Sequence, residues 1–386
     1  MSNTQTKNVP ELRFPGFEGK WEEKKLEDII KVNSGKDYKH LDKGDIPVYG
    51  TGGYMTSVSE PLSEIDAVGI GRKGTINKPY LLEAPFWTVD TLFYCTPKKE
   101  TDILFILSLF RKINWKVYDE STGVPSLSKQ TINKINRFVP TNKEQQKIGK
   151  FFSKLDRQIE LEEQKLELFQ QQKKGYMQKI FSQELRFKDE SGNDYPDWEE
   201  KELGEVADRV IRKNKNFESK KPLTISGQLG LIDQTEYFSK SVSSKNLENY
   251  TLIKNGEFAY NKSYSNGYPL GAIKRLTRYD SGVLSSLYIC FSIKSEMSKD
   301  FMEAYFDSTH WYREVSGIAV EGARNHGLLN ISVNDFFTIL IKYPSLEEQR
   351  KIGDFFIKLD RQIELEEQKL ELLQQRKKAL LKSMLI

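Results

Sequence analysis

The sequence predicts a mixed α/β (α+β) protein in which two α/β bodies are separated by a long antiparallel two-helix coiled coil, arranged as a pseudo-two-fold internal repeat. The first observation is a stretch that occurs twice: residues 144–181 and 348–385 match at a constant offset of 204, with 26 of 38 positions identical. The second is a heptad pattern of apolar residues inside both copies. A repeat of this length indicates two equivalent halves, and such a protein usually has a target with two equivalent halves.

A fainter repeat precedes each body. Leu12-Arg13-Phe14 recurs as Leu185-Arg186-Phe187, and the WEEKKL segment at Trp21 recurs as WEEKEL at Trp198. Each half therefore runs from an LRF segment through a divergent body to a proline and a long helix. The predicted boundaries are 1–143 for the first body domain, 144–184 for the central helix, 185–347 for the second body domain and 348–386 for the C-terminal helix.

Both long helices have a clear predicted start. Thr141-x-x-Glu144 and Ser345-x-x-Glu348 fit a capping box, each directly after a proline. The apolar stripe of the first copy then alternates spacings of four and three residues from position 148 to 180, and the second copy repeats it from 352 to 384. At about 1.5 Å per residue, each helix is about 55 Å long.

Each heptad stripe needs an apolar partner, and the other copy supplies one in an antiparallel pair. Charged residues interrupt the stripes, and unpaired charges are costly to bury, so we expect these residues to pair with each other. The expected pairs are Glu162 with Lys377, Lys173 with Glu366 and, between them, Leu166 with Leu373. The alternative is that these charges reach solvent and specify no register.

The bodies have the pattern of mixed α/β domains. Short apolar runs predict strands at 46–49, 67–70, 91–95, 258–260 and 287–292, and longer ones predict helices at 102–118 and 299–315. Cys95 and Cys290 follow similar strand sequences, LFYC and LYIC, so we expect buried thiols at matching places in the two halves. Two such cysteines do not make a disulfide framework, and this usage fits a reducing cytoplasm.

Bulk composition limits the class of protein. A length of 386 residues suggests two or three domains. No apolar run reaches the roughly 18 residues of a membrane span, and the polar N-terminus does not have the pattern of a signal peptide. The formal net charge of +4 permits nucleic-acid binding but is equally typical of proteins without that function.

Motifs of catalysis and cofactor binding fail in their context. Gly69-x-Gly71-x-x-Gly74 matches the dinucleotide fingerprint by letter, but Pro79 would break the helix that this fingerprint requires. Pro196-Asp197 and the acids after it resemble a nuclease metal motif, but they crowd into one turn, so we interpret them as a solvated domain start. His40, His310 and His326 have no zinc spacing. The Asn-Pro-Pro-aromatic segment of amino-methyltransferases is missing from the sequence, and so are serine–histidine nucleophile motifs.

Polar, basic and aromatic residues gather in the predicted loops of both bodies. Arg and Lys suit guanine edges and phosphates, and Asn and Gln suit adenine edges, so these loops are candidates for DNA contact. Residues 70–75 form a glycine-flanked basic loop, in which glycine lets the backbone approach a phosphate closely. For any single residue, ordinary solvated surface stays an open interpretation. The candidates are Lys36, Tyr38, Lys39, Tyr49, Thr51, Tyr54, Arg72 and Lys73 in the first body, and Arg212, Lys213, Lys215, Gln228, Asn261, Lys262, Tyr264, Asn266, Arg324 and Asn325 in the second.

These segments and the duplicated helix resemble the DNA-specificity (S) subunits of type I restriction–modification systems, over nearly the whole chain. The marks in the first body are IPVYG at 46–50, IGRKG at 70–74, PFW at 85–87 with DTLFY at 90–94, and VPSLS at 124–128. The last mark is the Pro…Glu-Gln…Lys-Ile start of each long helix, at 140–148 and 344–352. The second body departs from the pattern at 324–329, where RNHGLL replaces the expected Pro-Ser-Leu segment.

The resemblance implies a non-catalytic, cytoplasmic subunit of a type I site-specific deoxyribonuclease and adenine methyltransferase complex. Each body is then a target-recognition domain that reads one half of a split, asymmetric site on double-stranded DNA, and the paired helices set the spacer. The implied partners are two modification (methyltransferase) subunits and two ATP-dependent restriction subunits. S-adenosylmethionine, ATP and Mg²⁺ are expected in those partners, and no cofactor or metal is expected in this chain.

Two other functions remain as alternatives. A self-contained methyltransferase or nuclease would require a catalytic motif that the residues above do not supply. A coiled-coil scaffold without a DNA role would use only the helix pair and would leave the basic loops unexplained.

Overall fold

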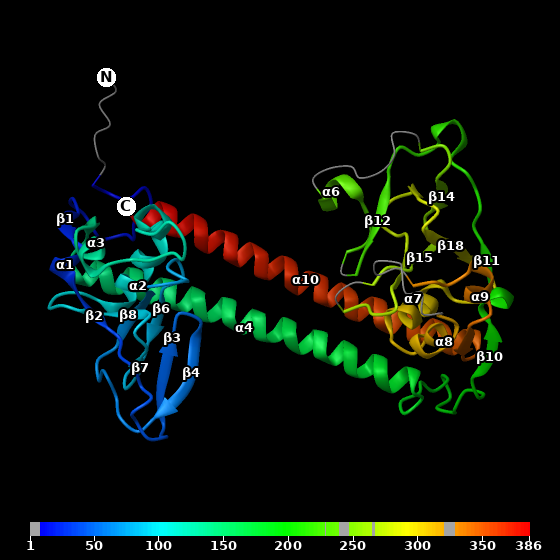
Figure 1. Cartoon of the computed structure of the whole chain (residues 1–386), viewed down its shortest axis with the longest axis horizontal. Helices are drawn as coiled ribbons and strands as arrows, with labels where there is room; N and C mark the ends of the chain where they lie inside the picture. The colour runs from blue at the N-terminus through cyan, green and yellow to red at the C-terminus, as the bar shows by residue number, and fades with distance from the viewer. Residues whose placement is uncertain (1–7, 228, 239–246, 265–266, 320–328) are drawn as a thin grey trace. The chain divides into compact units, whose positions relative to one another are not determined.

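The computed structural model describes residues 8–227, 229–238, 247–264, 267–319 and 329–386 (Figure 1). The chain divides into two compact units: Met1–Lys165 with Glu366–Ile386 form unit 1, and Leu166–Leu365 forms unit 2. The long helices belong to both. Helix α4 (Asn142–Phe181) begins in unit 1 and ends in unit 2, and α10 (Leu346–Met384) begins in unit 2 and ends in unit 1. Within the described residues, no helix has the length and apolar character needed to cross a membrane.

Unit 1 is a mixed α/β body built on an antiparallel sheet with the strand order β2-β8-β5-β6. A second sheet has the order β4-β3-β7, and β1 pairs with β9. Strand β5 is buried along its whole length, which explains its continuous apolar sequence, AVGIG. The elements are β1 (Glu22–Lys25), α1 (Leu26–Ile29), β2 (Ile30–Ser34), β3 (Ile46–Gly50), β4 (Gly53–Val58), β5 (Ala67–Gly71), β6 (Tyr80–Leu82), β7 (Trp87–Thr88), β8 (Leu92–Pro97), α2 (Ile103–Lys112), η1 (Trp115–Tyr118), α3 (Lys129–Asn133) and β9 (Asn136–Val139).

Unit 2 repeats this architecture. Its main sheet has the order β11-β18-β15-β16, β10 pairs with β19, and the pairs β12-β13 and β14-β17 complete the body. The elements are β10 (Glu199–Glu202), α5 (Leu203–Val206), β11 (Ala207–Arg209), η2 (Lys215–Phe217), β12 (Leu223–Ser226), β13 (Gly230–Asp233), α6 (Gln234–Phe238), β14 (Thr251–Lys254), β15 (Phe258–Asn261), β16 (Ala272–Arg275), β17 (Ser281–Leu284), β18 (Tyr288–Ile293), α7 (Lys299–Asp307), α8 (Tyr312–Ile318), α9 (Val333–Phe337) and β19 (Leu340–Tyr343).

The main sheets of the two units correspond strand by strand. Cys95 on β8 lies opposite Val68 on β5, and Cys290 on β18 lies opposite Ala259 on β15. Both thiols are buried and free, so the expectation of matching strand cysteines is confirmed. The pseudo-two-fold repeat therefore extends into the bodies, where the sequences have diverged.

The two body helices are shorter than predicted, and each breaks at a tryptophan turn. Helix α2 ends at Lys112, and the indole N–H of Trp115 donates to the carbonyl of Phe110 at 2.7 Å. In unit 2 the indole N–H of Trp311 donates to the carbonyl of Phe306 at 2.9 Å. An indole bond to a carbonyl of the last helical turn replaces the next backbone bond, so the single helices expected at 102–118 and 299–315 were wrong.

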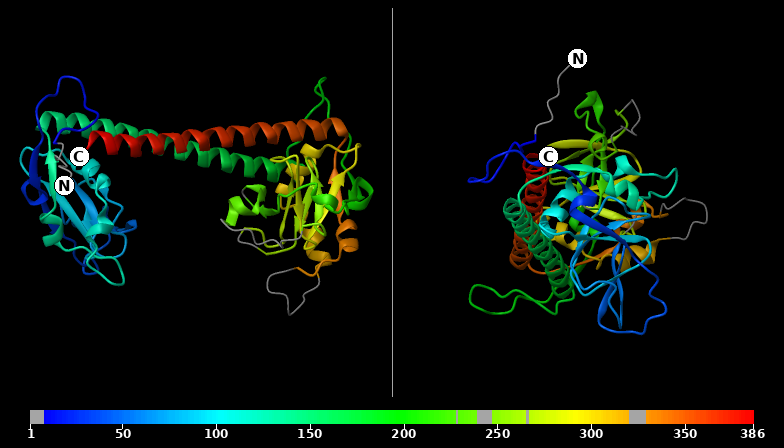
Figure 2. Two further views of the ribbon diagram at one scale, coloured as in Figure 1. Left: turned by 90° about the horizontal axis from the view of Figure 1, so that it is seen from above. Right: turned by 90° about the vertical axis from the view of Figure 1, so that its left-hand side faces the viewer.

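Each body core is completed by the end of a long helix. Leu381 and Met384 from the end of α10, and Leu385 directly after it, are buried in the core of unit 1. The end of α10 (red) lies beside the start of α4 (Figure 2). Ile180 and Phe181, from the end of α4, are buried in the core of unit 2. The long helices are therefore integral parts of the bodies.

The LRF segments bind the end of one long helix in the same way in both units. The amide of Leu12 donates to the carbonyl of Ser383, and the amide of Leu185 donates to the carbonyl of Lys179, both at 3.0 Å. Ser383 and Lys179 are equivalent positions of the repeat. In unit 1 this hydrogen bond joins two segments that are distant in the sequence. In unit 2 the equivalent bond lies within one continuous segment.

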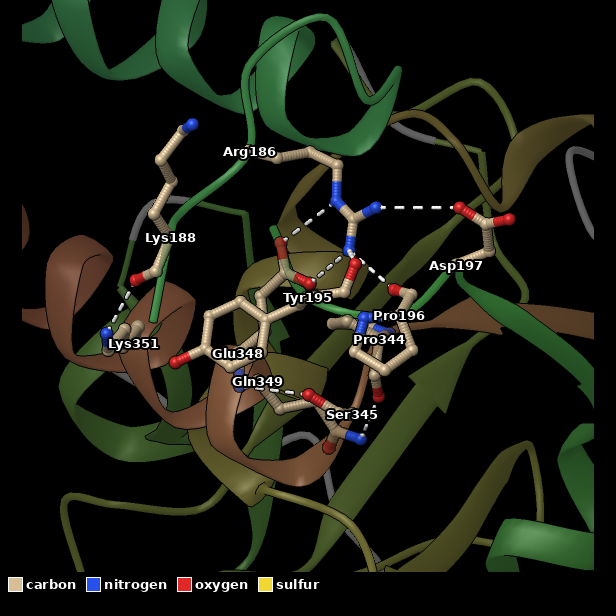
Figure 3. Close-up of polar contacts among 10 residues, drawn as sticks. All are labelled: Arg186, Lys188, Tyr195, Pro196, Asp197, Pro344, Ser345, Glu348, Gln349 and Lys351. Atoms are coloured by element: carbon tan, nitrogen blue, oxygen red, sulfur yellow. Dashed lines mark hydrogen bonds and ion pairs between the residues drawn. The ribbon is translucent and has the colours of Figure 1, made fainter. Parts of the chain in front are cut away.

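The LRF arginines bind the start of the other long helix. Arg186 donates to both carboxylate oxygens of Glu348, at 3.3 and 2.7 Å, and to the carbonyls of Tyr195 and Pro196 (Figure 3). The Glu348 side chain is fully buried, and its hydrogen bonds raise the pKa of Arg186. Arg13 binds the buried Glu144 in the same bidentate way.

These arginine contacts change the predicted capping boxes. The Ser345 hydroxyl accepts from the Glu348 amide at 3.5 Å, as a capping residue does. The Glu348 carboxylate, however, binds Arg186, so the reciprocal half of the box is replaced. The sequence pattern correctly marked the helix starts but assigned the glutamates the wrong partner.

The register of the helix pair differs from the predicted one by one heptad. In unit 1 Leu373 packs with Ile159, seven residues before its expected partner Leu166. Lys377 contacts Asp156, and Glu162 pairs with Lys369 at 2.6 Å. Glu366 pairs with Lys165 and, in unit 2, Lys173 pairs with Asp360, both at 2.5 Å.

The predicted pairs Glu162–Lys377 and Lys173–Glu366 are therefore wrong. The reason is that Lys165 and Lys369 lie beside the apolar stripe and not in it. Their long side chains extend to Glu162 and Glu366 and neutralise these carboxylates. A comparison of stripe positions alone does not include the two lysines.

Candidate nucleic-acid interface

The basic loop after β5 is anchored to the segment before α3. The amide of Leu127 donates to the carbonyl of Arg72 at 2.9 Å, and the amide of Gly74 donates to the carbonyl of Pro125 at 2.8 Å. A Cβ atom on Gly71 would lie 2.2 Å from the carbonyl oxygen of Thr75, so only glycine permits this return of the chain. Two motifs that are about 50 residues apart, IGRKG and VPSLS, thus form one site.

A basic cavity of about 400 Å³ lies at this site. The Arg72 guanidinium lies 5.9 Å from the centre of the Phe93 ring and 3.5 Å from the carbonyl oxygen of Asp90. Both Arg72 and Lys73 are exposed, so their charges are available to a ligand. The lining residues are Ser34, Arg72, Lys73, Phe93, Ser126, Leu127, Ser128 and Lys129. Three cations and three hydroxyl groups are a donor set that suits phosphate oxygens.

Two carboxylates hold the serine side of the cavity in place. Asp119 accepts from the amides of Ser126 and Ser121, and these bonds lower the pKa of Asp119. Glu120 accepts from the hydroxyls of Thr131 and Ser128, which lower its pKa as well. Their lone pairs are thus directed at protein donors that fix the loop.

The β3–β4 hairpin carries the aromatic candidates, and its turn lies near the basic loop. Tyr49 and Tyr54 face each other across the hairpin with ring centres 6.4 Å apart, and Tyr54 is 64% exposed. The Tyr80 hydroxyl donates to the carbonyl of Gly50, and burial raises the pKa of Tyr80. Thr51, at the hairpin turn, is the nearest neighbour of a Cβ built on Gly74. The structure therefore brings Thr51 close to the Arg72–Lys73 loop, and Tyr49 and Tyr54 lie on the two strands that flank this turn.

The remaining first-body candidates occupy another loop. Tyr38 packs against the cluster of Val48, Val58 and Trp87, and the Trp87 indole donates to the carbonyl of Lys36 at 2.9 Å. Tyr38 is thus largely a packing residue, whereas the side chains of Lys36 and Lys39 are exposed.

Several second-body candidates use their polar groups within the protein. Arg212 forms a bidentate pair with Glu257, at 3.2 and 2.8 Å. Lys213 donates to the carbonyl of Asn249, Lys262 to that of Ile331, and Asn261 accepts from the amide of Ser263. Lys215 and Tyr264 are exposed. Gln228, Asn266, Arg324 and Asn325 lie outside the described residues.

Unit 2 has a counterpart of the anchored loop. The amide of Leu329, before α9, donates to the carbonyl of Lys262, just after β15. This bond corresponds to the one between Leu127 and Arg72, although the Pro-Ser-Leu sequence is missing from unit 2. The two bodies therefore present different side chains at the same place.

Sequence reasoning missed the cavity residues Ser34, Ser128 and Lys129. The VPSLS motif was recognised, but its position beside Arg72 depends on backbone pairing that the sequence does not reveal. The nuclease-like segment shows no catalytic geometry in the described residues: Asp197 is fully exposed and lies 3.8 Å from Arg186. Across the described part of the chain, no group of three or more His, Cys, Asp or Glu side chains could hold a metal ion.

Comparisons with known proteins agree with this architecture. A family model for the type I restriction modification DNA specificity domain matches residues 18–170 and 195–375. The chain is 25% identical over 343 residues to the specificity subunit of the type I restriction enzyme MjaVIII from Methanocaldococcus jannaschii, covering 84% of this chain and 76% of the relative. The crystal structure of a type I restriction–modification S subunit from M. genitalium has a similar fold, with a TM-score of 0.66 and 16% identity over 98% of this chain and 99% of that one.

Proposed function

The chain belongs to the family of type I restriction–modification DNA-specificity proteins, and from this premise we propose that its two bodies read the two halves of one bipartite DNA site. The proposed recognition domains are residues 1–143 and 185–347. The proposal rests on the likeness of the main sheets and the difference between their loops. The sheets β2-β8-β5-β6 and β11-β18-β15-β16 correspond strand by strand, but the loops after β5 and β15 carry different side chains. Equivalent frames with unlike reading surfaces suit an asymmetric, split target.

The first body offers the clearer contact surface. Arg72, Lys73 and Lys129 supply cations for phosphates, and Thr51 beside this loop and the exposed Tyr54 on the same hairpin are proposed for base or sugar contact. In the second body the proposed contacts start from Lys215 and Tyr264, which are exposed.

The paired helices are proposed to set the spacer between the half-sites. Residues 144–184 and 348–386 supply the helix pair, whose ends are embedded in the body cores through residues such as Phe181 and Leu385. Because the helices are built into the bodies, a change in helix length transmits directly to the distance between the reading surfaces.

The chemistry is assigned to partner subunits. We propose that this chain recruits two modification subunits, which bind S-adenosylmethionine and methylate adenine, and two restriction subunits, which use ATP and Mg²⁺. The chain itself is proposed to be non-catalytic. The duplicated frame supports two equivalent docking positions, because a two-fold repeat presents the same surface twice.

Single-molecule methylation mapping of host DNA, with this gene present and deleted, tests the proposal. The expected result is a bipartite adenine-methylated motif that disappears on deletion. If methylation is unchanged, the chain co-purified with its partner subunits is assayed for duplex binding. Failure to bind any duplex would favour a coiled-coil scaffold, and S-adenosylmethionine binding by the chain alone would favour a self-contained methyltransferase.

A further inference from the structure

We propose that an Asp–Lys pair on the duplicated helices is a docking socket that accepts a body helix of either charge. Asp156 and Asp360 are equivalent positions of the repeat, and so are Lys173 and Lys377. In unit 1 Lys377 contacts Asp156, and in unit 2 Lys173 lies 2.5 Å from Asp360. We name these two pairs the sockets of unit 1 and unit 2.

The body helices bring opposite charges to the two sockets. Arg111, in the last turn of α2, contacts Asp156. Asp307, at the end of α7, lies 3.8 Å from Lys173. These two body residues are equivalent, because each directly follows the phenylalanine whose carbonyl accepts the indole bond, Phe110 or Phe306.

Because these side chains are partly buried, the sign of the charge on the body residue affects the stability of the contact. The side chains of Arg111, Asp156 and Lys377 are 26%, 23% and 22% exposed, and those of Lys173 and Asp307 are 21% and 23% exposed, whereas Asp360 is 49% exposed. At this burial two like charges facing each other would destabilise the contact, whereas an unlike partner avoids leaving a charge uncompensated. A socket made of one acid and one base offers an opposite charge to a body residue of either sign.

A pair that accepts either charge lets the same two helices hold two bodies whose sequences have diverged. The helix pair keeps the same Asp and Lys in both halves, whereas the body position has changed from Arg to Asp. In unit 2 Asp307 also forms an ion pair with Lys274, at 2.6 Å. Unit 1 is therefore the simpler place for a test. The socket concerns how the body is held and does not depend on DNA recognition.

The test is a set of variants in the full-length chain, measured by thermal unfolding and by hydrogen exchange of α2. Arg111→Asp should lower Tm by no more than the exposed control Arg157→Asp, because Lys377 takes over as partner. Lys377→Met alone should also be mild, because Arg111 still neutralises Asp156. The combination Arg111→Asp with Lys377→Met leaves two carboxylates facing each other, the new one and that of Asp156. Its Tm should fall by about 2–4 °C more than the sum of the single changes.

Restoring a base tests the charge itself. Arg111→Asp with Lys377→Arg should recover the Tm of Arg111→Asp and the exchange protection of α2, a recovery that packing alone does not predict. The proposal is overturned if Arg111→Asp by itself lowers Tm as much as the combination with Lys377→Met, or prevents folding. It is also overturned if the two changes are additive, because position 111 would then not use Lys377.

Discussion

Arg186 and Glu348 form a bidentate ion pair in which the carboxylate is fully buried, and Arg13 and Glu144 repeat it in the other unit. In both units a short segment before a body is thereby fixed to the first turn of the long helix that follows that body. The pairs join chain segments 162 and 131 residues apart.

Loss of this arginine should destabilise one unit selectively. Arg186→Ala leaves an unpaired buried carboxylate, and breaking such a pair costs about 3–5 kcal/mol. Hydrogen exchange should rise at the start of α10, whereas the start of α4, which Arg13 still holds, serves as the internal control. Adding Glu348→Gln removes the charge and should restore part of the protection. Equal protection in Arg186→Ala and the native chain would contradict a structural role for the pair.

The helix register can be tested by cross-linking. Ile159→Cys and Leu373→Cys lie in one cluster and should cross-link under mild oxidation or with a short bismaleimide. Leu166→Cys with Leu373→Cys, the pair expected from the sequence, is the matched control and should not. The native thiols give little background, since both are buried and burial raises the pKa of Cys290 to about 12. Cross-linking of the control pair alone would restore the original register.

Acidification should loosen the middle of the helix pair. The bond from Lys165 lowers the pKa of Glu366, so the stabilisation is complete above the usual glutamate pKa of about 4.3 and is lost as pH falls below it. Protection factors, which correct for the slower intrinsic exchange at low pH, should therefore fall around Glu162 and Glu366 below about pH 4.3. Glu366→Gln removes this titration, and the protection factors of that variant should depend less on pH. An identical pH profile in both proteins would exclude Glu366 as the group responsible.

The basic cavity predicts a salt-dependent effect on DNA binding. Replacing both Arg72 and Lys73 with Ala should weaken binding to all duplexes, and the slope of log affinity against log salt should fall by about 1 for each phosphate that the variant no longer binds. Lys24 and Lys25 on β1, which pair with Glu22 and Glu27, are matched control positions. Weaker binding with an unchanged slope would indicate that these side chains contact bases.

A longer helix pair should lengthen the recognised spacer. One heptad added to each helix extends the pair by about 10 Å, or about 3 base pairs at ~3.4 Å each. Methylation mapping should then show the same half-sites with a wider gap. The same insertion in one helix only breaks the pairing and serves as a control for folding. An unchanged spacer in a folded, active variant would argue against the helices as the ruler.

Much of the fold could be predicted because its signals are local or repeated. The duplicated stretch indicated the helix pair, and buried strands such as β5 and β15 lie within a residue of their predicted ranges. The helix breaks after Lys112 and Asp307 were missed because they depend on a tryptophan folding back onto a carbonyl. The register was missed because Lys165 and Lys369 act from outside the stripe.

The candidate site was only partly predictable, for a different reason. Arg72 and Lys73 were visible as a basic loop, but Lys129 became a neighbour only through the bond between Leu127 and Arg72. In the second body, Arg212 looked like a free base in the sequence, yet it is bound by Glu257, 45 residues away. Composition identifies a basic side chain, and only the fold decides whether its charge is already used.

The contact between Leu12 and Ser383 means that unit 1 binds the last turns of α10 as it would bind a ligand tethered to it. Unit 1 binds these turns through packing and hydrogen bonds, with no peptide bond between them and the segment at Leu12, whereas unit 2 holds the equivalent turns by chain continuity. The fraction of molecules in which unit 1 binds the end of α10 therefore depends on the effective concentration of these turns, which the rest of α10 keeps high. When that tether is weakened, the end of α10 from a second chain competes for the same place, which favours domain-swapped dimers that exchange this helix at high protein concentration.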